Sequence, residues 1–268
     1  MSKIISIYNF KGGVGKTTST VNLAYSWARN FKVLVIDCDP QINLTQSLTE
    51  STSSPTLYDA MRTVLHNQEV PTDFEKITSY LHLLRGDYRM VDMESNNQFI
   101  TFGPSLVERL MRKVKEEYDL IILDLPSYFG KVVQSFVINS DALVIPAIPD
   151  NFSMAGVQKL LNYLSNIERN YPLSVLGIFF NQMRLNTLHH RKMIAEAKQG
   201  LGDLVVNQFV RESIRISEAH EVGRSLYSGD TTSPVAQDFL KLSDELLSRL
   251  NRNYARELVE NGAVLESA

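Results

Sequence analysis

Short runs of apolar, often β-branched residues alternate along this chain with longer stretches in which apolar residues return every three or four positions. The short runs are almost continuously apolar, which is typical of strands in a sheet that is covered on both faces. They predict seven strands, over residues 3–9, 32–37, 80–86, 119–124, 141–148, 173–181 and 203–209.

The longer stretches have the spacing of amphipathic helices. The clearest of them predict helices over residues 17–30, 57–65, 105–118 and 234–250, and further helical stretches separate the later strands. This alternation predicts the α/β class, with a doubly wound, mostly parallel sheet and helices on both faces. We expect a single domain over residues 1–252 and a less apolar tail over 253–268 that frays.

Composition narrows the class of protein. Hydrophobic residues make up 44% of the 268 positions, enough for a sizeable core, and the formal net charge is only -3. A nucleic-acid-binding surface would therefore be a local patch on a mildly acidic body. The single cysteine, Cys38, excludes a disulfide framework within one chain, and we expect a buried, inert thiol. No apolar run reaches the roughly 18 residues of a membrane span or resembles a signal peptide, so we expect an intracellular protein without a membrane partner.

A glycine-rich turn, NFKGGVGKTTST over residues 9–20, joins the first predicted strand to the first predicted helix. Its glycines allow backbone N–H groups to close around an anion, and the start of the helix adds partial positive charge. In such a loop Lys16 reaches the β- and γ-phosphates of a nucleotide, and the Thr17 hydroxyl holds Mg²⁺. Phe10 stands where the ordinary pattern has its first glycine, and the loop carries a second lysine, Lys11.

Three segments, KGGVGKTT (11–18), VLVIDCDPQINLT (33–45) and DLIILDLPS (119–127), resemble the motifs of one family. They are similar to the deviant Walker A loop, the second motif and the Walker B strand of the ParA/MinD group of P-loop ATPases. Residues 177–182 and 214–228 resemble the nucleotide-base strand and the C-terminal region of that group. The resemblance extends to about residue 250 and implies ATP or ADP and Mg²⁺ as cofactors.

The resemblance implies different roles for the two lysines. Lys16 binds the phosphates of the ATP in its own subunit, whereas Lys11 reaches across a dimer interface to the phosphates of the other subunit's ATP. A second cation there is repelled by Lys16 unless a triphosphate is present, so ATP favours a homodimer more than ADP does. A solvated lysine beside the loop is the alternative for Lys11. The residues implied to bind the ATP phosphates are Lys11, Gly12, Gly13, Val14, Gly15, Lys16, Thr17 and Thr18.

Three aspartates follow predicted strands, at the edge where open α/β sheets place their ligand sites. By the resemblance, Asp124 binds a water on Mg²⁺, and Asp37 supports Mg²⁺ or Thr17. The implied metal group is therefore Thr17, Asp37 and Asp124, partly through water.

Two further roles follow from the resemblance. Asp39 corresponds to the residue that orients the attacking water, and it forms the implied catalytic group with Lys11 and Lys16; an Asx turn before the following proline is the alternative. Asn181, with Gln182, corresponds to the position that reads adenine, and a strand-end cap is the alternative.

The motifs are most similar to the ParA branch of the group, in the small form without an N-terminal helix-turn-helix. That branch implies a cytoplasmic, nucleoid-associated ATPase that hydrolyses ATP slowly, binds double-stranded DNA nonspecifically as its ATP dimer and is stimulated by a ParB-like or adaptor protein. Its cargo is a plasmid, a chromosome or another large assembly. One alternative is a MinD-like, membrane-associated positioning ATPase, which the acidic tail residues Glu257, Glu260 and Glu266 disfavour. The other is a scaffold or polymer-forming protein with weak hydrolysis.

Candidate DNA contacts are basic residues in the last third of the chain, namely Arg184, Arg191, Lys192, Arg215 and Arg224. A dimer doubles them, and affinity for DNA grows with the number of phosphates that are neutralised. The alternative for each residue is an ordinary solvated helix face.

Overall fold

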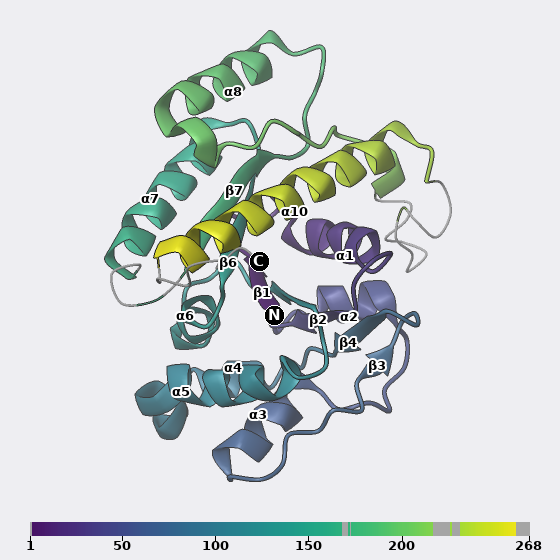
Figure 1. Cartoon of the computed structure of the whole chain (residues 1–268), viewed down its shortest axis with the longest axis vertical. Helices are drawn as coiled ribbons and strands as arrows, with labels where there is room; N and C mark the ends of the chain where they lie inside the picture. Colours follow the sequence, from purple (N-terminus) through teal and green to yellow (C-terminus); the bar gives the residue numbers. More distant parts are fainter. Residues whose placement is uncertain (1, 168–170, 172, 217–225, 227–230, 261–268) are drawn as a thin grey trace, which may run out of the picture.

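A seven-stranded sheet with helices on both faces forms the body of the protein, in a computed structural model that describes residues 2–167, 171, 173–216, 226 and 231–260 (Figure 1). The strands are β1 (Lys3–Ile7), β2 (Val33–Asp37), β3 (Glu75–Lys76), β4 (Leu81–Leu84), β5 (Leu120–Asp124), β6 (Ala142–Ala147) and β7 (Ser174–Phe180). Their order is β3-β4-β2-β5-β1-β6-β7, and every pairing is parallel except that of β3 with β4. The α/β class and the mostly parallel sheet are therefore confirmed.

The helices divide between the two faces of the sheet. They are α1 (Lys16–Trp27), α2 (Asn43–Leu48), α3 (Leu57–Leu65), α4 (Met90–Met93), α5 (Asn97–Val114), α6 (Lys131–Ile138), α7 (Asn151–Ile167), α8 (Leu188–Leu201) and α10 (Pro234–Glu260). Helices α1, α2 and α10 pack on one face, and α3 to α8 pack on the other (Figure 1). Each face of the sheet has its own hydrophobic core. Consecutive residues of a strand pack into the cores on opposite faces, as Ile4 and Ile5 of β1 do. No helix in the described ranges is both long and apolar enough to span a membrane.

Local sequence explains where two of these helices lie. Helix α3 begins with a capping box, in which Thr56 and Asp59 each accept a hydrogen bond from the other's backbone N–H. Helix α10 turns Phe239, Leu242 and Leu246 toward the sheet, because residues three and four apart share one helical face. The helix extends to Glu260, beyond the predicted end near residue 250. The domain limit at residue 252 stays a prediction.

The predicted strand over residues 203–209 is wrong. The segment begins as a short 3-10 helix, η1 (Gly202–Leu204), and then meets β7 through an isolated bridge between Val205 and Ile178. The backbone N–H groups of Asn207 and Gln208 donate instead to the Glu245 carboxylate of α10, at 2.9 and 3.0 Å. A side chain from another element therefore takes the donors that a strand ladder would use.

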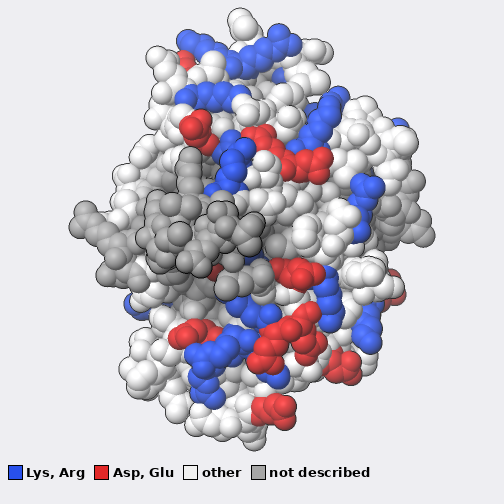
Figure 2. Space-filling model, viewed as in Figure 1, with Lys and Arg blue, Asp and Glu red and all other residues white. Residues whose placement is uncertain are grey.

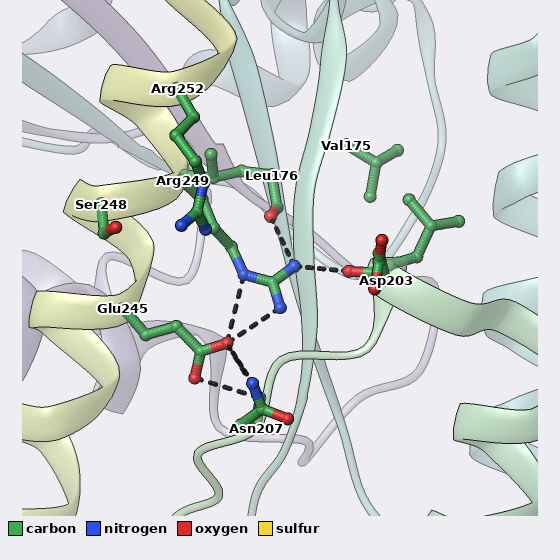
Figure 3. A pocket seen from close by; sticks show the side chains of 9 residues that line it. Val175, Leu176, Asp203, Asn207, Glu245, Ser248, Arg249 and Arg252 are labelled. Atoms are coloured by element: carbon green, nitrogen blue, oxygen red, sulfur yellow. Dashed lines mark hydrogen bonds and ion pairs between the residues drawn. The ribbon is translucent and has the colours of Figure 1, made fainter.

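A cavity of about 600 Å³ opens between β7, η1 and α10 (Figure 3). Within it Arg249 binds Glu245 at 2.8 Å and also donates to the carbonyl oxygens of Asp203 and Val205, at 2.5 and 3.3 Å. The cavity lies at the start of β7. The glycine-rich loop follows the end of β1, at the opposite edge of the sheet. Glu245 and Arg249 bind each other and the backbone, so we interpret the cavity as a structural junction rather than a nucleotide site.

Replacing Arg249 with Met is expected to lower the free energy of unfolding by about 2 kcal/mol or more, because Glu245 and two carbonyl oxygens lose their donor. Urea denaturation followed by circular dichroism measures the change. The matched control is Arg252→Met, an exposed residue one turn further along the same helix and at the border of the same cavity, which is expected to change stability by less than about 0.5 kcal/mol. Equal losses in the two variants would contradict this account.

Candidate nucleotide-binding site

The glycine-rich loop lies at the carboxyl end of β1 and leads directly into α1. Gly13 and Gly15 have φ angles of 74° and 88°, in the left-handed region that side chains rarely adopt. A Cβ atom on Gly15 would also lie 2.2 Å from Nδ2 of Asn181. Position 15 therefore requires glycine both for its backbone angle and for the close approach of Asn181.

The start of α1 is suited to an anion. Its first turn contains no acidic residue and its N-terminus has no side-chain cap, so its backbone N–H groups keep their partial positive charge. Lys16 donates from Nζ to Ser127 Oγ at 2.6 Å and to the Lys11 carbonyl oxygen at 3.5 Å. Burial lowers the pKa of Lys16, against the opposite effect of the Asp124 and Asp39 charges. A buried cation held mainly by a hydroxyl and a carbonyl is well placed to bind a phosphate.

Two buried carboxylates face each other across the pairing of β2 with β5, because Asp37 and Asp124 are register partners. Asp124 accepts hydrogen bonds from Thr17 Oγ1 at 2.7 Å and from Thr20 Oγ1 at 3.1 Å. Burial, assisted by the Asp37 charge, raises the pKa of Asp124 to about 7, and burial raises the pKa of Asp37 to about 6. Ionising both is costly without a nearby cation. The Asp124 carboxylate and the Thr17 hydroxyl, which lie 2.7 Å apart, provide the kind of oxygen ligands that Mg²⁺ prefers.

The structure does not bring Asp37 to Thr17. The Asp37 carboxylate accepts hydrogen bonds from the N–H and the Oγ1 of Thr45, at 2.8 and 2.7 Å, and the Thr45 hydroxyl accepts from Gly86 N–H at 2.8 Å. Asp37 therefore ties the start of α2 to the end of β4. Thr45 and Thr20 were not among the predicted site residues, although Thr20 lies three residues after Thr17 and thus on the same helical face.

The segment after β2 holds Asp39 half-buried in the Asx turn that was the alternative for this residue. Its Oδ1 accepts from Gln41 N–H at 2.9 Å. The Asp39 charge, like that of Asp124, partly offsets the lowering of the Lys16 pKa by burial, so the turn keeps Asp39 within range of the site. The neighbouring thiol of Cys38 is buried as predicted, and burial raises its pKa.

Lys11 has its partner within the same chain. Its Nζ lies 2.6 Å from Oδ2 of Asp150, and the two side chains are 28% and 35% exposed. The other carboxylate oxygen of Asp150 accepts from Ser153 N–H at 2.7 Å in the first turn of α7. Asp150 was not among the predicted residues, because nothing local in the sequence connects it to the loop 139 positions earlier.

The two residues after β7 hold the loop from the other side. Asn181 donates from Nδ2 to the Val14 carbonyl oxygen at 2.9 Å, and Gln182 donates from Nε2 to the Gly13 carbonyl oxygen at 2.7 Å. A cavity of about 150 Å³ lies beside Gln182 and Asp150. Both predicted adenine-binding residues therefore lie beside the loop, and Gln182 also borders an open space.

The predicted DNA-binding residues are partly engaged within the chain. Arg184 binds Glu212 through two nitrogens at 2.7 and 3.0 Å, Arg191 donates to the Leu185 carbonyl oxygen, and Lys192 lies 3.7 Å from Glu196. Arg215 is exposed, and Arg224 lies outside the described residues. Figure 2 shows basic side chains gathered over α8, at the top of this face.

The chain is similar to known proteins over most of its length. A family model described as "AAA domain" (AAA_31) matches residues 2–175. The chain is 30% identical over 256 residues to the sporulation initiation inhibitor protein Soj of Bacillus subtilis, covering 92% of this chain and 98% of Soj. It is 28% identical over 258 residues to the chromosome-partitioning ATPase Soj of Treponema pallidum, covering 93% and 98%.

Solved structures share the fold over most of their length. Apo McdA of Cyanothece superposes with a TM-score of 0.79 at 23% identity, covering 92% of this chain and 100% of McdA. The septum site-determining protein MinD of Pyrococcus horikoshii, complexed with Mg-ADP, superposes with a TM-score of 0.74 at 25% identity, covering 92% and 96%.

Replacing Gly15 with Ala is expected to destabilise the protein by about 1–3 kcal/mol, because alanine must adopt a left-handed φ against the Asn181 side chain. Chemical denaturation of the nucleotide-free protein measures the loss. Gly12→Ala is the control: its Cβ would lie 3.7 Å from Ser127 Oγ, an ordinary contact, so we expect stability to change by less than about 1 kcal/mol. A Gly12 variant as unstable as the Gly15 variant would refute the argument.

Proposed function

The chain belongs to the ParA/MinD group of P-loop ATPases, and on this premise we propose that it is a partition or positioning ATPase that forms a homodimer when it binds ATP. The observation that carries the proposal is the unequal environment of two lysines beside one loop. Lys16 is buried within the loop, whereas Lys11 lies at its border in a half-exposed ion pair with Asp150. The first lysine suits a phosphate in its own chain, and the second suits a phosphate brought by another.

ATP hydrolysis is assigned to the groups around the loop. The backbone N–H groups at the start of α1 and the Lys16 ammonium bind the β- and γ-phosphates. Thr17 and Asp124 would hold Mg²⁺, in part through water, and the ion would supply positive charge beside the phosphates. Asp39 orients the attacking water from the half-exposed segment after β2. Asn181 and Gln182, which both bind carbonyl oxygens of the loop, contact adenine, and Gln182 also borders the cavity beside the loop.

Relative energies explain why ATP would favour the dimer. A half-exposed ion pair such as Lys11–Asp150 contributes at most about 1 kcal/mol. A charge-assisted hydrogen bond to a phosphate contributes about 1.5–3 kcal/mol, and it gains from exclusion of water at an interface. Lys11 would therefore leave Asp150 for the γ-phosphate of a second copy, whereas ADP offers no such group.

DNA and a ParB-like or adaptor protein complete the proposed cycle in the cytoplasm, on the nucleoid. Arg184 and Lys192 form exposed ion pairs, and Arg191 donates to an exposed carbonyl oxygen; DNA phosphates can replace these contacts. Dimerisation doubles this patch, and partner-stimulated hydrolysis then releases the DNA. The relatives named as chromosome-partitioning ATPases support segregation of a large cargo.

Lys11→Ala is expected to bind ATP with nearly unchanged affinity but to remain monomeric with ATP and Mg²⁺, because the contact between subunits is lost. Multi-angle light scattering, with a fluorescent-ATP titration alongside, measures both properties. Asp150→Asn is the matched control: it keeps the acceptor for Ser153 N–H, releases Lys11, and should dimerise at least as readily as wild type. A Lys11→Ala dimer of undiminished strength argues against the assigned role.

Asp39→Ala is expected to dimerise with ATP but to hydrolyse it at least about 100-fold more slowly, because the water loses its orienting carboxylate. Phosphate release at saturating ATP measures turnover. Asp39→Asn separates the two roles, since its amide oxygen can still accept from Gln41 N–H. If Asp39→Asn hydrolyses ATP as fast as wild type, the role of Asp39 is to hold the Asx turn and not to orient the water.

A further inference from the structure

The segment between β5 and α6, residues 125–130, supplies the hydroxyl that holds Lys16. Ser127 Oγ accepts a hydrogen bond from Lys16 Nζ at 2.6 Å. A lysine ammonium has three N–H donors, so this bond leaves others for a phosphate. Ser127 therefore restricts the direction of the ammonium without occupying all of it. The place of the 125–130 segment thus determines where Lys16 points.

A carboxylate from a distant part of the chain holds the end of this segment. Helix α6 begins after Gly130, which has no side chain to cap it, so its first N–H groups need an acceptor from elsewhere. Glu94, directly after α4, supplies both oxygens. They accept from the N–H of Lys131 at 2.7 Å and from that of Val132 at 3.1 Å. Glu94 therefore fixes the start of α6, four residues after Ser127.

The glycine at position 130 makes room for this carboxylate. A Cβ atom on Gly130 would collide with both carboxylate oxygens of Glu94. The φ angle of Gly130 is -89°, which other residues adopt readily, so the backbone does not require glycine here. The missing side chain is therefore what lets Glu94 reach the start of the helix.

Aromatic contacts hold the same segment from the side of the loop. The Tyr8 hydroxyl donates to the Tyr128 carbonyl oxygen at 3.2 Å. The ring of Phe129 lies 5.7 Å from that of Tyr8 and 4.5 Å from that of Tyr163, between centroids. These contacts fix the middle of the segment, and the Glu94 carboxylate fixes its end. Ser127 is thus presented to Lys16 by a backbone that is held in two places.

We propose that Glu94 is a positioning residue for nucleotide binding, which holds the start of α6 and, through Ser127, directs the Lys16 ammonium toward the phosphates. The proposal rests on the proposed function, in which Lys16 binds the phosphates of ATP. Glu94 does not touch the nucleotide; its effect passes through one backbone segment and one hydrogen bond. A residue that only caps a helix would stabilise the fold and leave Lys16 unaffected.

Two substitutions remove the carboxylate from the helix start in different ways. Glu94→Ala deletes it, and Gly130→Ala displaces it, because the far end of a flexible side chain can move aside. Fluorescent-ATP titration with Mg²⁺, well below the melting temperature of every variant, measures the dissociation constant. We expect a rise of about fivefold or more in both, because a misdirected ammonium weakens a charge-assisted hydrogen bond. Glu94→Gln, which keeps one acceptor oxygen, should show a smaller rise.

Glu245 offers a matched control at the opposite edge of the sheet. Its carboxylate also accepts from two backbone N–H groups, those of Asn207 and Gln208, and it binds Arg249 as well. Glu245→Ala should therefore lower the melting temperature at least as much as Glu94→Ala does. The ATP dissociation constant of this control should change by less than about twofold, because distant sites act independently.

A double-mutant cycle tests the route through Ser127. Ser127→Ala alone should weaken ATP binding. In that background Glu94→Ala should raise the dissociation constant by less than about twofold further, because the hydrogen bond through which it acts is already gone. If the two losses multiply in full, Glu94 acts by another route and the inference is overturned.

The remaining outcomes separate this inference from the proposed function. If Glu94→Ala and Gly130→Ala bind ATP like wild type while Lys16→Ala does not, Glu94 is a helix cap only; the inference is overturned and the proposed function stands. If Glu245→Ala weakens ATP binding as much as Glu94→Ala, the loss reflects general destabilisation, and the inference is again overturned. If wild type binds no ATP, the proposed function fails and the positioning role fails with it.

Discussion

The parallel pairing of β5 with both β1 and β2 is the constraint on which the whole site depends. In that register Asp124 lies opposite Ile7, the last residue of β1, and also opposite Asp37. The glycine-rich loop, the start of α1 and two carboxylates therefore meet at one edge although they are far apart in the sequence. A shift of one residue would turn Asp124 to the other face of its strand. The apolar residues that fix the register thus also fix the chemistry.

Elements with local signals could be predicted from the sequence, whereas the partners of individual side chains could not. Continuous apolar runs predict the central strands, and the glycines before Lys16 predict the loop. The spacing of residues along the chain does not tell which side chains meet at the edge of the sheet. Neither the Lys11–Asp150 ion pair nor the hydrogen bond between Thr45 and Asp37 could therefore be predicted. The wrong strand over residues 203–209 has the same cause, since its composition suits a strand but Glu245 takes its N–H groups.

Phe10 shows how the loop departs from the ordinary phosphate-binding pattern without losing its shape. Its ring packs edge-to-face against Tyr8 at 5.5 Å and against Phe129 at 5.3 Å. Position 10 needs no glycine, because the positive φ angles occur later, at Gly13 and Gly15. The aromatic contacts join the beginning of the loop to the segment after β5, which also supplies Ser127 to Lys16. The substitution therefore adds a packing contact where the backbone tolerates one.

In the proposed function, Lys11 exchanges Asp150 for a phosphate of a second subunit. Whether it can do so depends more on the solvent exposure of the Lys11–Asp150 ion pair than on the short distance between its atoms. A fully buried pair would hold the lysine so strongly that a phosphate could not compete, because separating two buried charges costs about 3–5 kcal/mol. Here both partners reach solvent, and Asp150 also accepts a hydrogen bond from α7. A pair of this kind keeps Lys11 beside the loop at a cost to release of at most about 1 kcal/mol. Under the proposed function, a third phosphate on a second subunit is then enough to decide where Lys11 binds.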